Sequence, residues 1–320
     1  MLLKSLFVLL IVDLLHGAAS IVDISPYDVD PRHYMKIRIL DQRSLSYPNI
    51  DGLHFFGISD LAYDARRRRL YLLGDQKGSL FVFRASFGEK IDSLEPLYAV
   101  ELTGKGGKAF RRWRRDSEGM TLDRRGRVLV SFEGHPKIGR FDRRGRMQKR
   151  YRLPPELRNA KNYRSRNKSL ESLALHPRYG LLTAAEWPLK RERPKDQAIY
   201  ALSGRVWHFK AEPDRGSAVV AMEVMDDGTI LVLERAYSGL YNPVVITLKK
   251  VWLKGCHRKR KGKRSVCRSE VLAKFSSADG WQVDNFEGLA KVGKNRYVMV
   301  SDDNDNFFQR TLLLYFEVAE

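Results

Sequence analysis

The stretch SEGMTLDRRGRVLVSFEGH, residues 117–135, decides the fold that we expect for this chain. It consists of a short apolar strand, a polar turn over residues 123–127, and a second strand rich in Val, Leu and Phe. This order is typical of a β-hairpin whose second strand is buried. Glu118 opens the first strand and Glu133 closes the second, so the hairpin carries one acid at each of its two free ends.

Four other segments repeat this layout, at intervals of about 50 to 70 residues. They begin at Ile58, Leu170, Ala218 and Phe286. Further strand-like runs lie between the hairpins, at residues 80–84, 138–142, 198–202, 206–210, 244–248 and 312–318. One hairpin and two outer strands per repeat is the composition of a four-stranded propeller blade. No segment shows a sustained helical period, which disfavours a parallel βαβ fold.

The sequence therefore predicts an all-β fold, a β-propeller, as a single domain over residues 21–320. Five inner hairpins are recognisable. We expect residues near 21–56, together with a terminal strand, to supply a sixth four-stranded blade that closes the ring, and we favour six blades over five. The alternative fold is a β-sandwich, which would not need repeats at this spacing.

Acidic residues recur at the strand ends of the repeats. Four pairs are separated by 15 positions: Asp60 and Asp75, Glu118 and Glu133, Glu171 and Glu186, and Glu287 and Asp302. In the remaining repeat Glu234 closes the second strand, but the opening position falls near the apolar Val219. The start of the first strand and the end of the second lie at the same end of a hairpin. Both sets of acids are therefore expected at one face of the propeller, around its axis.

Carboxylates that are crowded in this way repel one another, by roughly 4 kcal/mol for two charges about 4 Å apart at an effective dielectric constant of about 20. Such a cluster requires a cation, paired Arg or Lys side chains, or raised pKa values. Ligands that are all oxygen favour Ca²⁺ or Mg²⁺. The expected metal ligands are Asp60, Asp75, Glu118, Glu133, Glu171, Glu186, Glu234, Glu287, Asp302 and Asp303. The competing interpretation is structural, because acids at strand ends also hold loops through hydrogen bonds to backbone N–H groups.

The turns at the opposite end of the hairpins are strongly basic. The inner turns hold Arg66, Arg67, Arg68, Arg69, Arg124, Arg125, Arg127, Arg178, Lys294 and Arg296, and an outer turn adds Arg143, Arg144 and Arg146. In an up-and-down blade these turns point the same way. The sequence therefore predicts a bipolar molecule with an acidic mouth and a basic underside.

Residues 1–20 have the pattern of a cleaved signal peptide: Lys4, an apolar run at 6–12, and small residues at 17–20. The alternatives are an uncleaved anchor and a buried first strand. We expect an exported protein, periplasmic or secreted, that is a monomer without a transmembrane helix in the mature chain. The net charge of +20 suits nucleic acid, but export makes that partner a weak candidate. An anionic small-molecule substrate or an anionic envelope polymer is expected instead.

The two cysteines, Cys256 and Cys267, flank a very basic loop at 254–268. In an exported protein two nearby cysteines predict a disulfide that closes a surface loop. The spacing also fits two free thiols, whereas a zinc site would lack a fourth ligand.

Several short motifs together resemble the phytase-like family, whose members carry the label "esterase-like activity of phytase". The motifs are DSEGM at 116–120, the segment 167–173 with Glu171, the LER ending at 233–235, DNFEGL at 284–289, and SDDNDN at 301–306 followed by Phe308, Gln309 and Thr311. The resemblance covers roughly residues 50–318. It implies a β-propeller domain, an exported location and an esterase or phosphatase-like activity.

The residues themselves restrict the chemistry. Gly57-Ile58-Ser59 is followed by Asp60 and Leu61 rather than by a pattern ending in glycine, so the nucleophile elbow of a serine esterase is not supported. Metal-assisted hydrolysis is the compatible mechanism. Its candidate catalytic residues are Glu118, Glu171, Glu287 and His135, and its candidate substrate-binding residues are Arg235, Arg310 and Lys77.

Two functions follow from these candidates. The first is a divalent-cation-dependent hydrolase of phosphate esters or related esters, with Ca²⁺ or Mg²⁺ as cofactor. The alternative is a non-catalytic propeller of the cell envelope, in which the acids hold a structural cation and the basic underside meets an anionic polymer.

Overall fold

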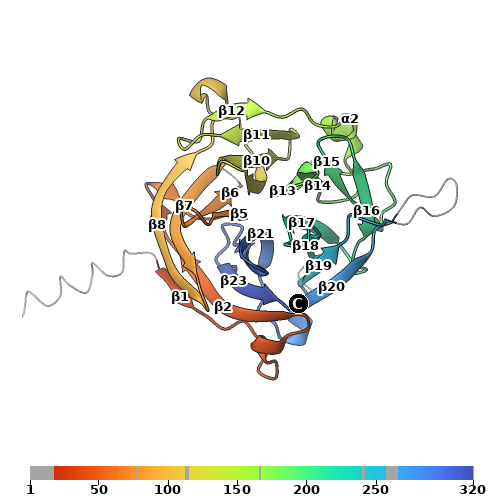
Figure 1. Ribbon diagram of the computed structural model, residues 1–320. Helices are drawn as coiled ribbons and strands as arrows, with labels where there is room; N and C mark the ends of the chain where they lie inside the picture. The colour runs from red at the N-terminus through yellow and green to blue at the C-terminus, as the bar shows by residue number, and fades with distance from the viewer. Residues whose placement is uncertain are drawn as a thin grey trace, which may run out of the picture.

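The computed structural model describes residues 18–75, 78–111, 115–165, 167–239, 242–256 and 266–319. These residues form a ring of antiparallel sheets around a central axis, which Figure 1 shows end-on. The predicted β-propeller is therefore confirmed. The described residues form five blades, whereas the sequence favoured six. No helix among them is long and apolar enough to cross a membrane.

The first four blades each contain four consecutive strands that pair with their neighbours in chain order. Blade 1 contains β5 (Ile58–Asp64), β6 (Arg69–Gly74), β7 (Ser79–Phe87) and β8 (Ile91–Glu101). Blade 2 contains β9 (Ser117–Leu122), β10 (Val128–Phe132), β11 (Lys137–Phe141) and β12 (Met147–Arg150). Blade 3 contains β13 (Leu170–His176), β14 (Gly180–Ala185), β15 (Asp196–Ala201) and β16 (Val206–Lys210). Blade 4 contains β17 (Ser217–Val224), β18 (Ile230–Ala236), β19 (Val245–Val251) and β20 (Ser269–Ser276).

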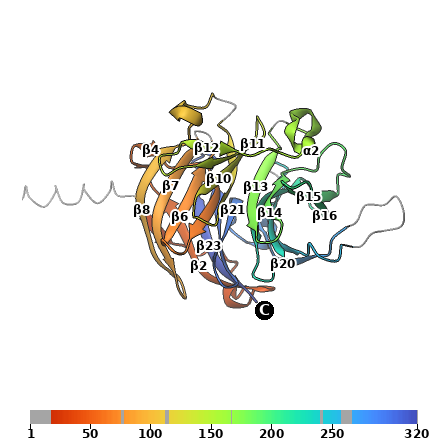
Figure 2. The ribbon, with the colours of Figure 1, turned by 45° about the horizontal axis from the view of Figure 1, so that its top comes forward.

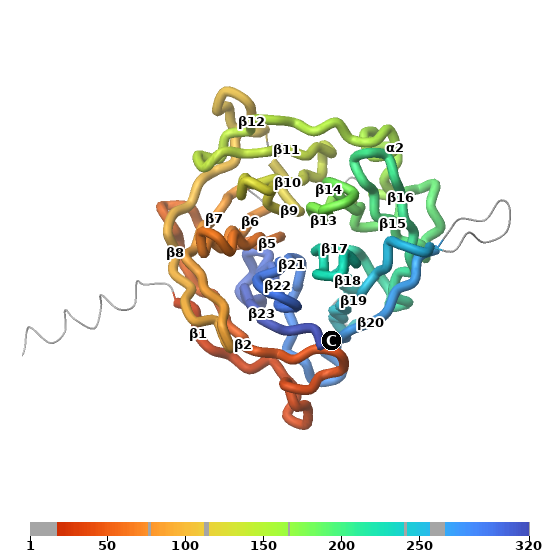
Figure 3. Tube along the Cα trace, viewed as in Figure 1, coloured from red at the N-terminus to blue at the C-terminus, as the bar shows by residue number. Residues whose placement is uncertain are grey.

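Blade 5 joins the two ends of the chain. Its strands are β21 (Asn285–Gly293), β22 (Arg296–Asp302) and β23 (Thr311–Val318) from the C-terminal part, and β2 (Ile37–Ser46) and β1 (Ala18–Ile21) from the N-terminal part. β2 pairs antiparallel with β23, from Ile37 opposite Val318 to Leu45 opposite Thr311. Figure 3 shows this red N-terminal segment beside the blue C-terminal one. The residues expected to build a sixth blade therefore complete the fifth, and this explains the difference in blade count.

The remaining elements are short and lie in the connections. β3 (Asn49–Ile50) and β4 (Leu53–His54) form a small hairpin, and α2 (Pro155–Arg158) lies between blades 2 and 3. Single 3₁₀ turns occur at Pro31–His33, Lys105–Gly107, Ala160–Asn162 and Ser277–Asp279. Strand β1 includes residues 18–20 of the expected signal peptide. Residues 1–17 of that peptide lie outside the described part of the chain.

The apolar core is divided into five clusters, one at each contact between neighbouring blades. The cluster between blades 1 and 2, for example, joins Leu73 and Val82 to Val130 and Phe141. Because each sheet packs against a neighbour on both faces, its inner strands read as continuous apolar runs such as VLVSF in β10, which is buried at every position. A two-sheet sandwich would bury one face of each sheet and would show alternation instead.

Two of the basic turns, both in blade 2, are built around an aspartate that binds backbone N–H groups. In the turn after β9, the Asp123 carboxylate accepts hydrogen bonds from the N–H groups of Arg125 and Arg127, at 2.9 and 3.0 Å. The turn after β11 has the same sequence, DRRGR, and Asp142 makes the same two contacts with Arg144 and Arg146. Each turn ends on a glycine with a φ of 72°, a conformation that favours glycine. In Figure 2 the C-terminus marks the end of the propeller where the inner turns lie, and α2 marks the mouth.

Two inner strands approach each other so closely that a side chain does not fit between them. A Cβ atom added to Gly119 would lie 2.7 Å from the carbonyl oxygen of Glu171 and 2.7 Å from Oγ of Ser131. Gly288 is equally crowded, since its Cβ would lie 2.8 Å from Cα of Asp60. The glycines of the EG dipeptides in blades 2 and 5 therefore allow the inner strands of neighbouring blades to lie close together around the axis.

We expect Gly119→Ala to lower the free energy of unfolding by about 1–3 kcal/mol, because the new methyl group forces the strands of blades 2 and 3 apart. Chemical denaturation measures this loss. Gly293→Ala in the same type of strand is the control, since its Cβ would meet its nearest atom at 3.5 Å. An equal effect of the two substitutions would contradict the close-approach explanation.

Candidate functional site

A β-bulge interrupts the inner strand of every blade near the mouth. A bulge inserts an extra residue and re-aims its side chain. In blades 2, 3 and 5 the bulge holds an acid: Glu118, Glu171 and Glu287. The corresponding residues are Ser59 in blade 1 and Val220 in blade 4. Three of the predicted acids thus come from one structural position, repeated around the axis.

A second set of side chains follows the neighbouring strand of each blade. On the second strand of each blade, the residue that pairs with the inner strand on the mouth side of the bulge is Gly74, Phe132, Ala185, Glu234 or Ser301. The next residues along the chain are therefore equivalent: Asp75, Glu133, Glu186, Arg235 and Asp302. Four blades place an acid here, and blade 4 places an arginine.

Both sets of side chains line one cavity of about 830 Å³ at the mouth of the axis. Its acidic lining residues are Asp75, Glu118, Glu133, Glu171, Glu186, Asp284, Glu287 and Asp302. Among the described residues, only Lys168 and Arg235 line it with a positive charge. The predicted gathering of acids is therefore present in the structure, and two cations do not balance them.

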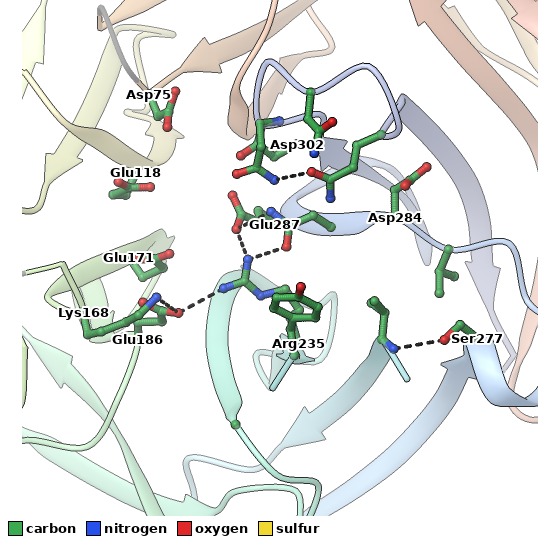
Figure 4. Close-up of a pocket in the computed structure, with 18 of the residues that line it drawn as sticks. Asp75, Glu118, Lys168, Glu171, Glu186, Arg235, Ser277, Asp284, Glu287 and Asp302 are labelled. Carbon is green, nitrogen blue, oxygen red and sulfur yellow. Dashed lines mark hydrogen bonds and ion pairs between the residues drawn. The ribbon is translucent and has the colours of Figure 1, made fainter. Parts of the chain in front are cut away.

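Arg235 pairs with acids on one side of the cavity (Figure 4). Its guanidinium donates to Glu287 and to Asn285, and lies 3.1 Å from Oε1 of Glu186. Lys168 Nζ donates to the same Glu186 oxygen at 2.9 Å. Glu186 and Glu287 are thus paired with cations, which ties blades 3, 4 and 5 together at the mouth.

The acids on the side of blades 2 and 3 have a different environment. Asp116, Glu118 and Glu133 each offer a carboxylate oxygen, and these oxygens all lie within 4.8 Å of one another. Glu171, from blade 3, is 6% exposed, and within the described residues no hydrogen-bond donor reaches its buried Oε2 atom. A buried carboxylate oxygen without a partner is costly unless a proton or a cation satisfies it.

Burial and mutual repulsion raise the pKa values of these acids. The pKa of Glu118 lies well above its usual range because the side chain is buried and Glu171 and Glu133 are close. Burial raises the pKa of Glu133 to about 8 and that of Asp302 to about 9, and neighbouring acids add to the rise in both. In the absence of a cation the site therefore binds protons at neutral pH.

We expect the cation-free protein to lose stability as the pH rises from about 5 to about 9. Carboxyl groups with raised pKa values bind more protons in the folded state, so their stabilising effect is complete below the unfolded pKa and is lost as the pH passes the folded one. Calorimetric melting temperatures at about pH 6, 7 and 8 with a chelator measure this slope. Saturating Ca²⁺ should flatten it, and a cation-free protein that is equally stable across this range would contradict the assignment.

Three of the predicted metal ligands lie away from the cavity lining. Asp60 follows the bulge of blade 1, and its carboxylate accepts from the N–H groups of Met120 and Leu289 on the two neighbouring blades and from that of Leu61. Glu234 precedes Arg235 and accepts from Lys249 Nζ at 2.8 Å and Ser217 Oγ at 2.9 Å. Asp303 accepts from the N–H of Gly57 and from Thr311 Oγ1. The contacts of these three residues are of the kind that the structural interpretation describes.

The predicted substrate-binding and acid–base residues are scattered. Arg235 lines the cavity, whereas Arg310 donates to Asp284 Oδ2 at 3.2 Å from outside its lining. His135 lies beyond the end of β10, where Nε2 is 3.4 Å from Arg150, and it does not line the cavity. Lys77 lies outside the described residues. The predicted disulfide between Cys256 and Cys267 is present.

Sequence reasoning missed several residues of the site. Asp116 belongs to the DSEGM motif but lies before the strand, so the spacing of the acid pairs did not reveal it. Lys168 and Asn285 lie beside Glu171 and Glu287 in the sequence, which was an available signal. Tyr237 was also missed. It lines the cavity together with Trp187 and Phe308, whose places beside the acidic strand ends do indicate a pocket lining. Phe308 is 86% exposed and is an accessible apolar side chain in a part of the lining that also contains Asn306 and Gln309.

Comparison with known proteins identifies a family. Residues 53–305 match the family "Phytase-like", described as esterase-like activity of phytase. This chain belongs to the phytase-like family. The match includes every strand of the first four blades and the acids of the cavity. No curated protein matches the chain.

The solved structures that match this phytase-like chain have low sequence identity and low TM-scores. The PQQ-bound aldose sugar dehydrogenase of Streptomyces coelicolor is 10% identical, with coverage of 95% of this chain and 98% of that one and a TM-score of 0.41. The virginiamycin B lyase of Staphylococcus aureus is 9% identical, with coverage of 94% and 99% and a TM-score of 0.32. A GH43 glycoside hydrolase is 11% identical, with coverage of 70% and 42% and a TM-score of 0.42. Similarity at this level carries no information about the activity of this chain.

Proposed function

We propose that this phytase-like protein is a hydrolase of phosphate esters or related esters that depends on a divalent cation. The observation that carries the proposal is the group formed by Asp116, Glu118 and Glu133, beside a buried Glu171 oxygen that has no partner among the described residues. An arrangement of this kind is destabilising by itself. The cluster of buried carboxylates is explained if a ligand of opposite charge binds between them.

Ca²⁺ or Mg²⁺ fits this donor set, because every available ligand atom is a carboxylate oxygen. Asp116, Glu118 and Glu133 would hold the ion, with Glu171 beside them. When bound, such an ion polarises a phosphoryl or acyl oxygen and lowers the pKa of a bound water molecule.

The other residues of the cavity have complementary roles in this proposal. Arg235 and Lys168 supply positive charge across the cavity from the acids of blade 2 and would orient an anionic substrate. Asp302 replaces His135 as the proposed proton donor, because it lines the cavity and its pKa of about 9 keeps the carboxyl group protonated at neutral pH. Trp187, Tyr237 and Phe308 would contact the organic part of the substrate.

The test is a metal analysis of the purified protein, followed by assays with p-nitrophenyl phosphate and p-nitrophenyl acetate before and after chelation. We expect cleavage of at least one ester, its loss on chelation and its recovery with Ca²⁺ or Mg²⁺. Glu89→Gln, which changes an acid with an 83% exposed side chain, should cleave the esters like the parent protein. Absence of hydrolysis across both esters with either cation would reject the enzyme.

The second candidate is a binding propeller in which the same cation is structural. Its support is that Glu171 of blade 3 lies close to Glu118 in the group of candidate ligands from blade 2, so an ion that also reached Glu171 would join two blades. Melting temperature and ester cleavage, measured together, distinguish the two candidate functions. A structural ion raises the melting temperature but supports no ester cleavage. A catalytic ion raises the melting temperature and also supports ester cleavage.

Export is part of this proposal. The signal-peptide pattern of residues 1–20 and the disulfide between Cys256 and Cys267 support it, because disulfides persist in oxidising compartments. The test is amino-terminal sequencing of the protein recovered from the periplasm or the medium. Recovery of the uncleaved chain from the cytoplasm alone would reject export.

A further inference from the structure

A groove crosses the end of the propeller opposite the acidic cavity. Its central part is a hollow of about 680 Å³ between the inner turns of blades 1 and 2. Toward the rim it continues into a hollow of about 200 Å³, with which it shares Arg67, Arg125 and Gly126. Toward the axis it continues into a hollow of about 190 Å³, with which it shares Tyr63 and Arg124. The three hollows form one path from the axis to the outer turn of blade 2.

Arginine dominates the charge of this groove. The guanidinium side chains that line its central and outer parts are Arg66, Arg67, Arg124, Arg125, Arg127 and Arg143. Lys291 is at the end nearest the axis. Arginine presents a planar fork that binds an oxyanion through two parallel hydrogen bonds.

Four acids line the three hollows, and all of them are engaged: Asp64, Asp123, Asp142 and Glu223. Asp142 accepts from the N–H groups of Arg144 and Arg146, and Glu223 accepts from those of Val224 and Lys291. Asp64 Oδ2 lies 2.6 Å from Arg67, and Asp123 Oδ2 lies 2.6 Å from Arg127. Their other oxygens accept the backbone N–H groups of the turns. Among the described residues, Arg66, Arg124, Arg125 and Arg143 have no carboxylate partner. The local excess of positive charge is therefore available to a ligand.

We propose that this groove binds a linear polymer that carries phosphate groups at intervals. The guanidinium groups are spread along a path across two blades rather than gathered at one point, which matches a chain of anions better than a single small anion. The surplus also agrees with a net charge of +20 in a molecule whose opposite end is acidic. Binding of this kind is independent of the hydrolysis proposed for the mouth.

The test compares two triple variants. Arg66→Ala, Arg125→Ala and Arg143→Ala remove three exposed side chains, whereas the turn hydrogen bonds of Arg66 and Arg125 come from their backbone N–H groups and are kept. The control changes Arg152, Lys161 and Arg193 to Ala, which are equally exposed but lie on connections at the mouth. Circular dichroism and melting temperature establish that both variants are folded.

The probe is labelled inorganic polyphosphate, titrated by fluorescence anisotropy over a range of salt concentrations. We expect parent and control to bind alike. The groove variant should bind at least about 10-fold more weakly, with a slope of log K against log salt that is smaller by about two. Equal binding by the groove variant and the control overturns the proposal.

Three other probes decide the chemistry. Orthophosphate should compete poorly, and polygalacturonate of equal charge should bind more weakly than polyphosphate. Tighter binding of polygalacturonate would assign the groove to carboxylate polymers, and tighter binding of single-stranded DNA would assign it to nucleic acid. Either result overturns the phosphate polymer.

Discussion

Replacing Arg235 with methionine is expected to lower the free energy of unfolding by about 3–5 kcal/mol. The side chain is 14% exposed and contacts Glu186 and Glu287, the acids of two neighbouring blades. Removing it leaves two buried carboxylates with only Lys168 to compensate one of them. Methionine keeps the volume, so the loss reports the charge rather than a cavity.

The measurement is chemical denaturation at neutral pH, with Arg84→Met as the control. Arg84 also forms an ion pair with a glutamate, but both side chains are more than half exposed, so little change is expected. Adding Glu287→Gln to the Arg235 variant should restore part of the lost stability. Equal losses for Arg235 and Arg84, or no recovery in the double variant, would mean that the arginine does not balance the acids of the mouth.

Replacing Glu118 with glutamine is expected to lower the affinity for Ca²⁺ or Mg²⁺, and the rate of ester cleavage, by roughly 100-fold or more. The same substitution should make the cation-free protein more stable above about pH 7, because it removes one member of a mutually repelling group. A variant that misfolds would lose both cation binding and stability. Weaker cation binding together with higher stability therefore points to removal of a metal ligand.

Isothermal titration calorimetry measures the affinity, and thermal melting with and without a chelator measures the stability. Asp60→Asn is the matched control, since it removes a buried acid that binds backbone N–H groups outside the cavity. It should destabilise the protein and leave cation affinity unchanged. If Glu118→Gln binds the cation as tightly as the parent, the group at blade 2 is not the metal site.

Much of the site follows from the repeat alone, and the exceptions have a physical cause. Glu118, Glu171 and Glu287 reach the cavity because each occupies the bulge of its strand. Asp60 shares the 15-residue spacing but not the position. The turn of blade 1 has four residues between the paired Asp64 and Arg69, whereas that of blade 3 has three between His176 and Gly180. Because of that extra turn residue, the residue at the bulge of blade 1 lies 16 positions before Asp75, so it is Ser59 rather than Asp60.

A similar one-residue offset explains Glu234 and Arg235. The sequence assigned the ring position to the acid, whereas the register of β17 and β18 assigns it to the arginine that follows. The blade count depended on a long-range pairing: nothing within residues 37–46 indicates whether they begin a blade or complete one. Such information lies in the partner strand, more than 260 positions away, rather than in local pattern.

The pairing of β2 with β23 constrains the order in which the molecule can form. β2 can pair with β1 early, but its other edge has no partner until β23 has been synthesised, so the ring cannot close before then. A nascent or truncated polypeptide would present unpaired edges and uncovered apolar faces, which favour aggregation. The seam between the first and last segments is also where local opening should be detected first, and amide hydrogen exchange in residues 37–46 would report it.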